Sequence, residues 1–147
     1  MSTTKQSQKH IEESDQAVVL HPDNNDLFLR TGKQIIAACR MNISIDVWFS
    51  EFNGMLHRVK GWVHEHESRV SLCYCAARGS QITFFFVPSS DTFDFDLADE
   101  LVSLNSELVT SFNVGMVEIH QIPGGDVDRF LNPDESRLVY GDDRSAH

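Results

Sequence analysis

The stretch QITFFFVP, residues 81–88, decides the fold that the sequence predicts. Its β-branched and aromatic residues favour a strand, and the closing proline ends it. Because successive side chains of a strand point to opposite faces, one face carries Ile82, Phe84 and Phe86 and the other carries Phe85 and Val87. Apolar residues on both faces are typical of a central strand that is covered on both sides.

Two further strands are predicted beside this one. RVSLCYCAA, residues 69–77, alternates as a strand, and RGSQ supplies the turn of an antiparallel hairpin with 81–88. The third strand is GMVEIHQIP, residues 115–123, and a helical crossover from 81–88 makes it parallel to that strand, with a right-handed connection. In the 69–77 strand we expect Val70, Leu72, Tyr74 and Ala76 on one face and Ser71, Cys73, Cys75 and Ala77 on the other.

Three helices are predicted around these strands. The first covers residues 26–41, after the turn cluster HPDNND with its candidate caps Asp23, Asn24 and Asn25. The second begins at Ile45, after Ser44 as N-cap, and its apolar residues recur at steps of three and four as far as Val63. The third carries a similar stripe: Leu97, Leu101, Leu104, Leu108 and Phe112. A last helical turn at Val127, Phe130 and Leu131 is expected to cover an edge.

The predicted fold is therefore a single small α/β (α+β) domain with the order α-α-β-β-α-β. Its three-stranded mixed sheet has 81–88 in the middle and helices packed on it. A chain of 147 residues suits one domain. We expect a flexible polar tail over residues 1–16, a globular domain over 17–131 and a polar C-terminal tail over 132–147. AVVL, residues 17–20, is expected to be a short strand or a docking segment.

The charge of the chain is acidic and uneven. The formal net charge is −10, and residues 67–147 alone carry −9. Such a surface repels phosphate backbones and anionic lipid, so we expect neither nucleic acid nor a membrane as a partner. The sequence shows no apolar run of about 20 residues and no secretory signal, and its three cysteines form no disulfide framework. These features predict a cytoplasmic protein with reduced thiols.

The acidic stretch SSDTFDFDLADEL, residues 89–101, is the first candidate site. It lacks the spacing and the glycine of a calcium loop, and a lone D-x-D is a weak magnesium signal. Helix capping explains it better: Asp94 is the preferred N-cap, because Phe93 and Ala98 then stand at the positions of a hydrophobic staple. The candidate interaction surface comprises Asp91, Asp94, Phe95, Asp96, Asp99 and Glu100.

A second candidate site is a metal or thiol centre built from His64, His66, Cys73 and Cys75. These residue types suit zinc, but their spacing does not match the usual ligand motifs. Nothing in the sequence pairs a cysteine with a histidine base, and no phosphate-binding loop is present. We therefore expect no cofactor and interpret the two cysteines as buried strand residues.

The function that the sequence favours is a non-enzymatic protein–protein interaction module. The motivation is surplus apolarity, since Trp48, Trp62 and ten phenylalanines exceed what one face of a three-stranded sheet covers. The partner would be a second copy in a homodimer or another protein. One alternative is an acidic adaptor, chaperone or immunity-type protein that neutralises a basic partner. The other is a small metal-dependent or thiol enzyme that uses His64, His66, Cys73 and Cys75.

Overall fold

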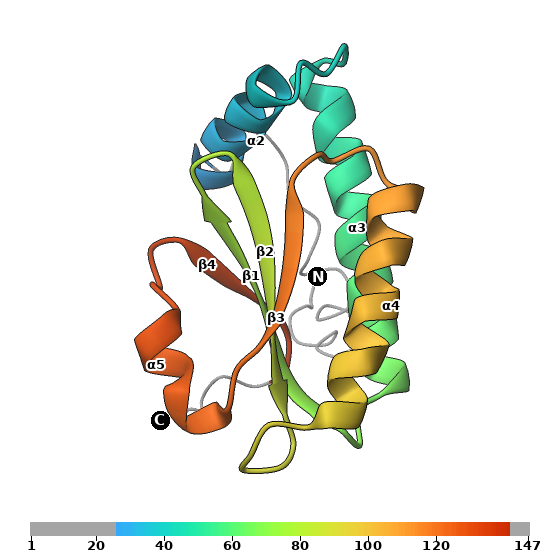
Figure 1. Ribbon diagram of the computed structural model, residues 1–147. Coiled ribbons are helices and arrows are strands. Elements are labelled where there is room, and N and C mark those ends of the chain that lie inside the picture. The colour runs from blue at the N-terminus through green and yellow to red at the C-terminus, as the bar shows by residue number, and fades with distance from the viewer. Residues whose placement is uncertain (1–25, 142–147) are drawn as a thin grey trace, which may run out of the picture.

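The strand predicted over residues 81–88 forms as β2 (Gln81–Pro88), inside a four-stranded mixed sheet. In the computed structural model, which describes residues 26–141, the strand order is β3-β2-β1-β4 (Figure 1). β1 (Val70–Arg78) pairs with β2 as an antiparallel hairpin, and β3 (Val117–Gln121) pairs with β2 in parallel. The α+β class, the hairpin, the parallel crossover and the position of β2 between its two predicted neighbours are all confirmed.

Three helices precede or connect these strands. They are α2 (Asp26–Ala38), α3 (Ile45–Glu65) and α4 (Phe95–Ser111). Ser44 caps α3 as predicted, because its hydroxyl oxygen accepts a hydrogen bond of 3.2 Å from the Val47 amide. α2 is three residues shorter than predicted. Arg40 adopts a left-handed backbone conformation with φ 53°, which turns the chain out of the helix before residue 41.

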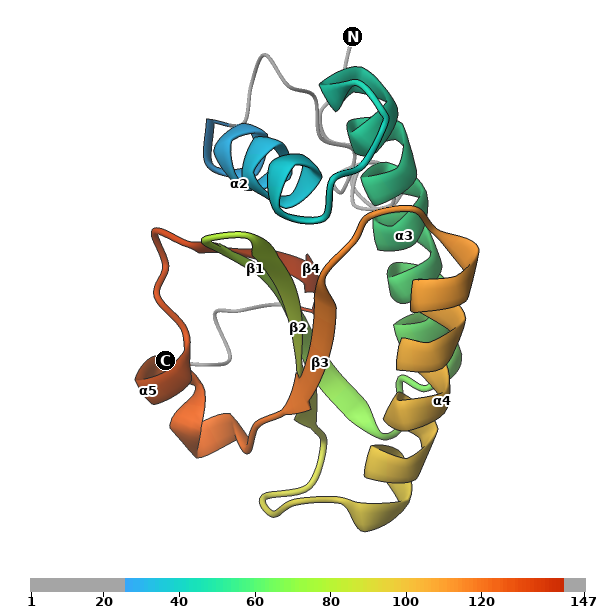
Figure 2. The ribbon, with the colours of Figure 1, turned by 45° about the horizontal axis from the view of Figure 1, so that its top comes forward.

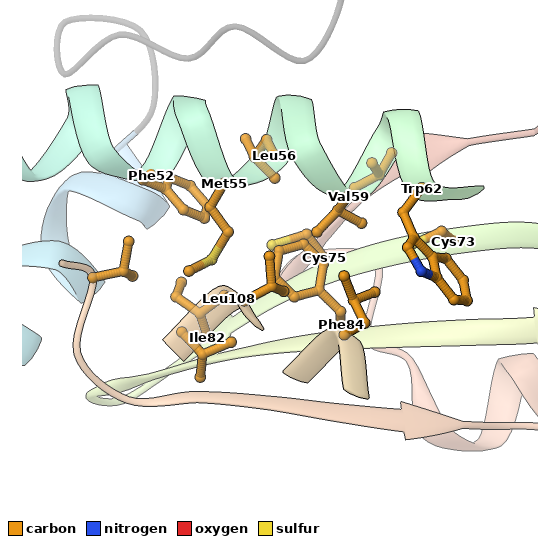
Figure 3. Close-up of a cluster of buried hydrophobic side chains, with 14 of the residues drawn as sticks. Phe52, Met55, Leu56, Val59, Trp62, Cys73, Cys75, Ile82, Phe84 and Leu108 are labelled. Carbon is orange, nitrogen blue, oxygen red and sulfur yellow. The ribbon is translucent and has the colours of Figure 1, made fainter. Parts of the chain in front are cut away.

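The main core lies between the sheet and these three helices (Figures 2 and 3). α3 supplies the largest part of it, since its whole apolar stripe from Trp48 to Val63 is buried. Trp48 stacks on Phe52, with ring centroids 4.9 Å apart, and its Nε1–H donates to the Val114 carbonyl oxygen at 2.9 Å. This packing buries both tryptophans and five of the ten phenylalanines that the sequence presents as surplus: Phe28, Phe49, Phe52, Phe84 and Phe86.

The other face of the sheet carries a smaller core. η2 (Gly124–Asp126) and α5 (Val127–Phe130) cross it, on the side away from α3 and α4 (Figure 2). The helical turn predicted at Val127, Phe130 and Leu131 is thus present, but it covers a face of the sheet and not an edge, because Val127 and Leu131 pack against side chains of β1 and β2. This second cluster comprises Leu72, Tyr74, Ala76, Phe85, Val87, Ile122, Val127 and Leu131. Both faces of β2 are covered, as its two-sided apolarity predicted.

The sheet has one strand more than predicted. β4 (Ser136–Tyr140) pairs antiparallel with β1, so the polar tail expected over residues 132–147 instead supplies an edge strand. The physical reason is visible in β1, where every residue from Leu72 to Ala77 is buried. A strand buried in this way on both faces requires a partner along each edge.

One smaller expectation is wrong, and others fall outside the part of the chain that the structure describes. Val70 was assigned to the face of Leu72, but it belongs to the main core, because the pairing of β1 with β2 shifts register between these two residues. Residues 1–16, the segment AVVL and the candidate caps at positions 23–25 lie outside the described residues.

Candidate functional site

The acidic stretch begins α4, and Asp94 is the N-cap of this helix, as predicted. Its Oδ1 accepts hydrogen bonds of 3.0 Å from the Leu97 amide and 3.0 Å from Arg69 Nη2. The hydrogen bond from the Leu97 amide is the largest cause that lowers the pKa of Asp94. The hydrogen bond and the charge of Arg69 lower it further, and desolvation opposes them. This carboxylate is therefore occupied in holding the helix start, and it is only partly exposed.

A side chain from β3 holds the same helix start. The Gln121 Oε1 accepts from the Asp94 amide at 2.7 Å, and the Gln121 Nε2 donates to the Asp94 carbonyl at 3.0 Å. The two bonds imitate the paired hydrogen bonds of neighbouring strands. They join the start of α4, the crossover helix between β2 and β3, to the end of β3.

Arg69 also neutralises a second candidate carboxylate. Its Nη1 donates to the Glu100 Oε1 at 2.9 Å, so one guanidinium bridges Asp94 and Glu100. Both carboxylates favour the charged guanidinium, and the hydrogen bond to Asp94 is the largest cause of the raised pKa of Arg69. Of the six predicted surface residues, these two belong chiefly to the scaffold of the helix start.

The remaining candidates face solvent. Asp91, Asp96 and Asp99 are exposed, and Phe95 is 77% exposed. Phe93 is 42% exposed, and its ring lies edge to face with that of Phe95, with centroids 5.0 Å apart. An aromatic pair thus stands in water among three carboxylates.

Phe95 is the first member of a longer exposed line on α4. Val102 and Val109 follow it at steps of seven residues, with exposures of 70% and 52%. Seven residues are close to two helical turns, so the three side chains lie on one side of the helix, opposite the buried leucines. We call Phe95, Val102 and Val109 the α4 ridge. The sequence reasoning missed the two valines because it followed only the leucine stripe; a second apolar line at heptad spacing was the available signal.

The four residues of the candidate metal or thiol centre have separate environments. His64 is exposed and lies 3.2 Å from Glu67, whereas His66 stacks on Trp62 with ring centroids 3.8 Å apart. Cys73 and Cys75 share the inner face of β1, as expected, and are buried in the main core (Figure 3). Among residues 26–141, no group of three or more His, Cys, Asp or Glu side chains is placed to hold a metal ion.

Burial also determines the chemistry of the two thiols. Desolvation raises the pKa of Cys75 and is the main cause that raises the pKa of Cys73 well above its usual value. Both thiols therefore stay protonated near neutral pH. A nucleophile or a zinc ligand requires the thiolate form, so these environments are unfavourable for either role.

A pocket of about 580 Å³ opens on the other face of the sheet, beside α5. Its lining includes Arg78, Thr83, Phe85, Glu118, His120 and Phe130. Pairing of β2 with β3 sets Thr83 beside Glu118 and Phe85 beside His120, while α5 contributes Phe130. No sequence motif joins these residues, since strand register and the path of α5 bring them together. In the sequence, His120 stands only as one residue of the strand predicted over 115–123.

Polar groups surround the aromatic floor of this pocket. The rings of Phe85 and His120 stack with centroids 5.8 Å apart, and the Arg78 guanidinium carbon lies 5.9 Å from the Phe85 centroid. Arg78 also donates to the Phe130 carbonyl at 2.8 Å and pairs with Glu135 at 3.3 Å. The Glu118 carboxylate lies 3.1 Å from the His120 Nε2. A concave site with an apolar floor and a few converging polar groups has the usual form of a ligand pocket.

No helix within residues 26–141 is long and apolar enough to cross a membrane. Neither face of the molecule can be interpreted by analogy with a relative. Comparisons of this chain with protein-family models, with curated proteins and with solved structures find no significant match.

Proposed function

We propose that this protein is a non-enzymatic binding module that docks another protein on the α4 ridge. The observation that carries the proposal is the exposure of Phe95, Val102 and Val109 in one line, with Asp96 and Asp99 exposed on the same helix. Single exposed apolar side chains are ordinary, whereas three that recur on one side of a helix, about 10 Å apart and bordered by charge, favour an interaction site.

The spacing of the ridge favours a helical partner. Its three side chains recur at the heptad interval and span about 21 Å along the helix axis, at roughly 1.5 Å per residue. A second helix lying alongside would meet one ridge residue every two turns, which is half the frequency of a coiled-coil seam, where positions a and d both contribute. The proposed partner segment is therefore an amphipathic helix with an apolar stripe.

Charge specifies the flanks of that partner helix. Asp91, Asp96 and Asp99 border the N-terminal end of the ridge, and the whole chain carries −10. Lys or Arg beside the apolar stripe would complement these carboxylates and accelerate association. A second copy of this chain would bring the same carboxylates to the interface, and both tryptophans are already buried within one chain. The charge pattern thus favours a basic heterologous partner over a homodimer.

The proposed setting is the cytoplasm. Cys39, Cys73 and Cys75 are all free thiols in the structure. Cysteines kept free in this way suit a reducing compartment.

Two designed peptides would test the docking surface. Both form an amphipathic helix with leucines at heptad spacing, and they differ only in carrying Lys or Glu beside the leucines. Calorimetry and backbone amide shifts should show the Lys peptide binding along α4, at least about tenfold more tightly than the Glu peptide. Higher salt should weaken this binding, because exposed charges are screened.

Matched variants assign the binding to the ridge. Val102→Ser removes an exposed apolar side chain from the ridge, while Val47→Ser removes one of 48% exposure from α3. The first substitution should weaken the Lys peptide about five- to tenfold, and the second should leave its affinity unchanged. Equal binding of both peptides, or equal effects of both substitutions, would refute the proposal. Concentration-dependent dimers that Val102→Ser abolishes would replace it with the homodimer.

A further inference from the structure

We infer that the pocket beside α5 binds a planar aromatic group that carries one positive charge. The pocket lies beside α5, on one face of the sheet, whereas α4 packs on the other face (Figure 2). This inference therefore does not rest on the proposed docking function. Three features of its lining carry it: the aromatic floor, a buried hydroxyl and the balance of charge. The volume of about 580 Å³ is in the range that holds small organic ligands.

The floor and mouth of the pocket present aromatic surface. Phe85 is only 6% exposed, so its ring is fixed by the second core, while Phe130 is half exposed at the other side of the pocket. The imidazole of His120 stacks on Phe85 at an interplanar angle of 26°. A flat ring that enters here would meet the imidazole of His120 and, at the mouth, the ring of Phe130, and aromatic rings favour such stacked or edge-to-face contacts.

Thr83 supplies hydrogen bonding at the floor. It is one of few buried polar side chains in the described part of the chain, and its hydroxyl oxygen accepts a hydrogen bond of 3.2 Å from Gln81 Nε2. A hydroxyl that accepts in this way keeps its own hydrogen for donation. The pocket can therefore satisfy one oxygen or nitrogen on the edge of a bound ring.

The charge of the lining favours a cation. The single guanidinium, that of Arg78, is balanced by Glu135 at 3.3 Å. Of the two carboxylates in the lining, Asp126 is in turn paired with Arg129 at 3.5 Å, which leaves Glu118, 3.1 Å from His120, as the carboxylate that would face a ligand cation. With a chain charge of −10 around them, an anionic ligand would be repelled and a cationic one attracted. An ammonium beside the half-exposed ring of Phe130 gains further from the face of that ring.

Three small probes separate these requirements. Tyramine has an aromatic ring, a hydroxyl and an ammonium. The probe 3-(4-hydroxyphenyl)propionate replaces only the ammonium, by a carboxylate. The probe 4-(2-aminoethyl)cyclohexanol keeps the ammonium and the hydroxyl and lacks only the aromatic ring. We expect tyramine to shift the backbone amides of Thr83, Phe85 and His120 and to bind at least about tenfold more tightly than either of the others. Equal or tighter binding of either other probe overturns the inference, as does the absence of these shifts at about 5 mM tyramine.

Isosteric substitutions locate the site. Thr83→Val removes the hydroxyl and Glu118→Gln removes a carboxylate charge, and each should weaken tyramine binding about three- to tenfold. Ser103→Ala, on the exposed side of α4, should leave it unchanged. The amide spectrum of each variant shows that it is folded. If both pocket variants fold and bind tyramine with the affinity of the original chain, the inference is wrong.

Discussion

Replacing Gly32 by alanine should destabilise this protein, although alanine is the better helix former. Gly32 is buried on α2 where that helix meets α3. A Cβ at this position would lie 2.7 Å from Cε3 and 2.8 Å from Cζ3 of Trp48, and 3.1 Å from Cδ1 of Ile45. Separations below 3.0 Å are essentially never found for real Cβ atoms, so the ring or the helix must move.

The Trp48 ring has little freedom to yield. It stacks on Phe52 at 4.9 Å, meets Phe49 edge to face at 5.2 Å, and donates its Nε1–H to the Val114 carbonyl. Overpacking of a well-filled core costs about 1–3 kcal/mol, and the pinned ring places this case near the upper end. The helix propensity of alanine returns about 1 kcal/mol. The net loss in the free energy of unfolding should therefore be about 2 kcal/mol.

Gly61 provides the matched control. It lies inside α3, and a Cβ there meets no atom within 4 Å. Gly61→Ala should therefore show only the propensity gain of about 1 kcal/mol. With a urea m-value of about 2 kcal/mol/M, the unfolding midpoint should fall by about 1 M for Gly32→Ala and rise by about 0.5 M for Gly61→Ala. A midpoint for Gly32→Ala that equals or exceeds that of the original chain would refute the packing argument.

Three further outcomes are expected. Because the pKa of Asp94 is lowered in the folded state, its stabilising effect should be complete at neutral pH and fade as the pH falls below about 4. In urea unfolding of Asp94→Asn, the free energy of unfolding should therefore fall less steeply with acid than in the original chain. An equally steep fall would contradict the assignment. Cys39, which is exposed, should react with a thiol reagent in the folded protein, whereas Cys73 and Cys75 should react only after unfolding. A chain that ends before β4 should lose cooperative unfolding or aggregate, because the outer edge of β1 is then unpaired; native-like thermal unfolding of this shorter chain would show that β4 is dispensable.

The parts of the fold that were predictable are those with strong local patterns. Three local patterns, each within about twenty residues, predict their own structure. They are the apolar stripe of α3, the two-sided apolarity of β2 and the turn between β1 and β2. The cap at Asp94 was predictable for the same reason, since capping depends on neighbours in the chain.

The parts that were missed depend on distant contacts. β4 has only five residues between charged segments, and its partner β1 lies about sixty residues earlier. Arg69 reaches Asp94 and Glu100 only after the turn before β1 is placed beside the start of α4. The pocket combines residues of β1, β2, β3 and α5, and no periodicity within one of these elements indicates that the others will face it.

The double hydrogen bond between Gln121 and the backbone of Asp94 has a thermodynamic consequence. Gln121 is also part of the pocket lining, while Asp94 starts the helix that carries the α4 ridge. The Gln121 side chain bonds to α4, on the face of the sheet opposite Glu118 and His120, so a pocket ligand that moved the Gln121 backbone would also move the first turn of α4. Linkage makes such an effect reciprocal: a partner that stabilises the start of α4 would alter the affinity of the pocket by the same factor. A substitution of Gln121 would consequently report on both faces of the sheet at once.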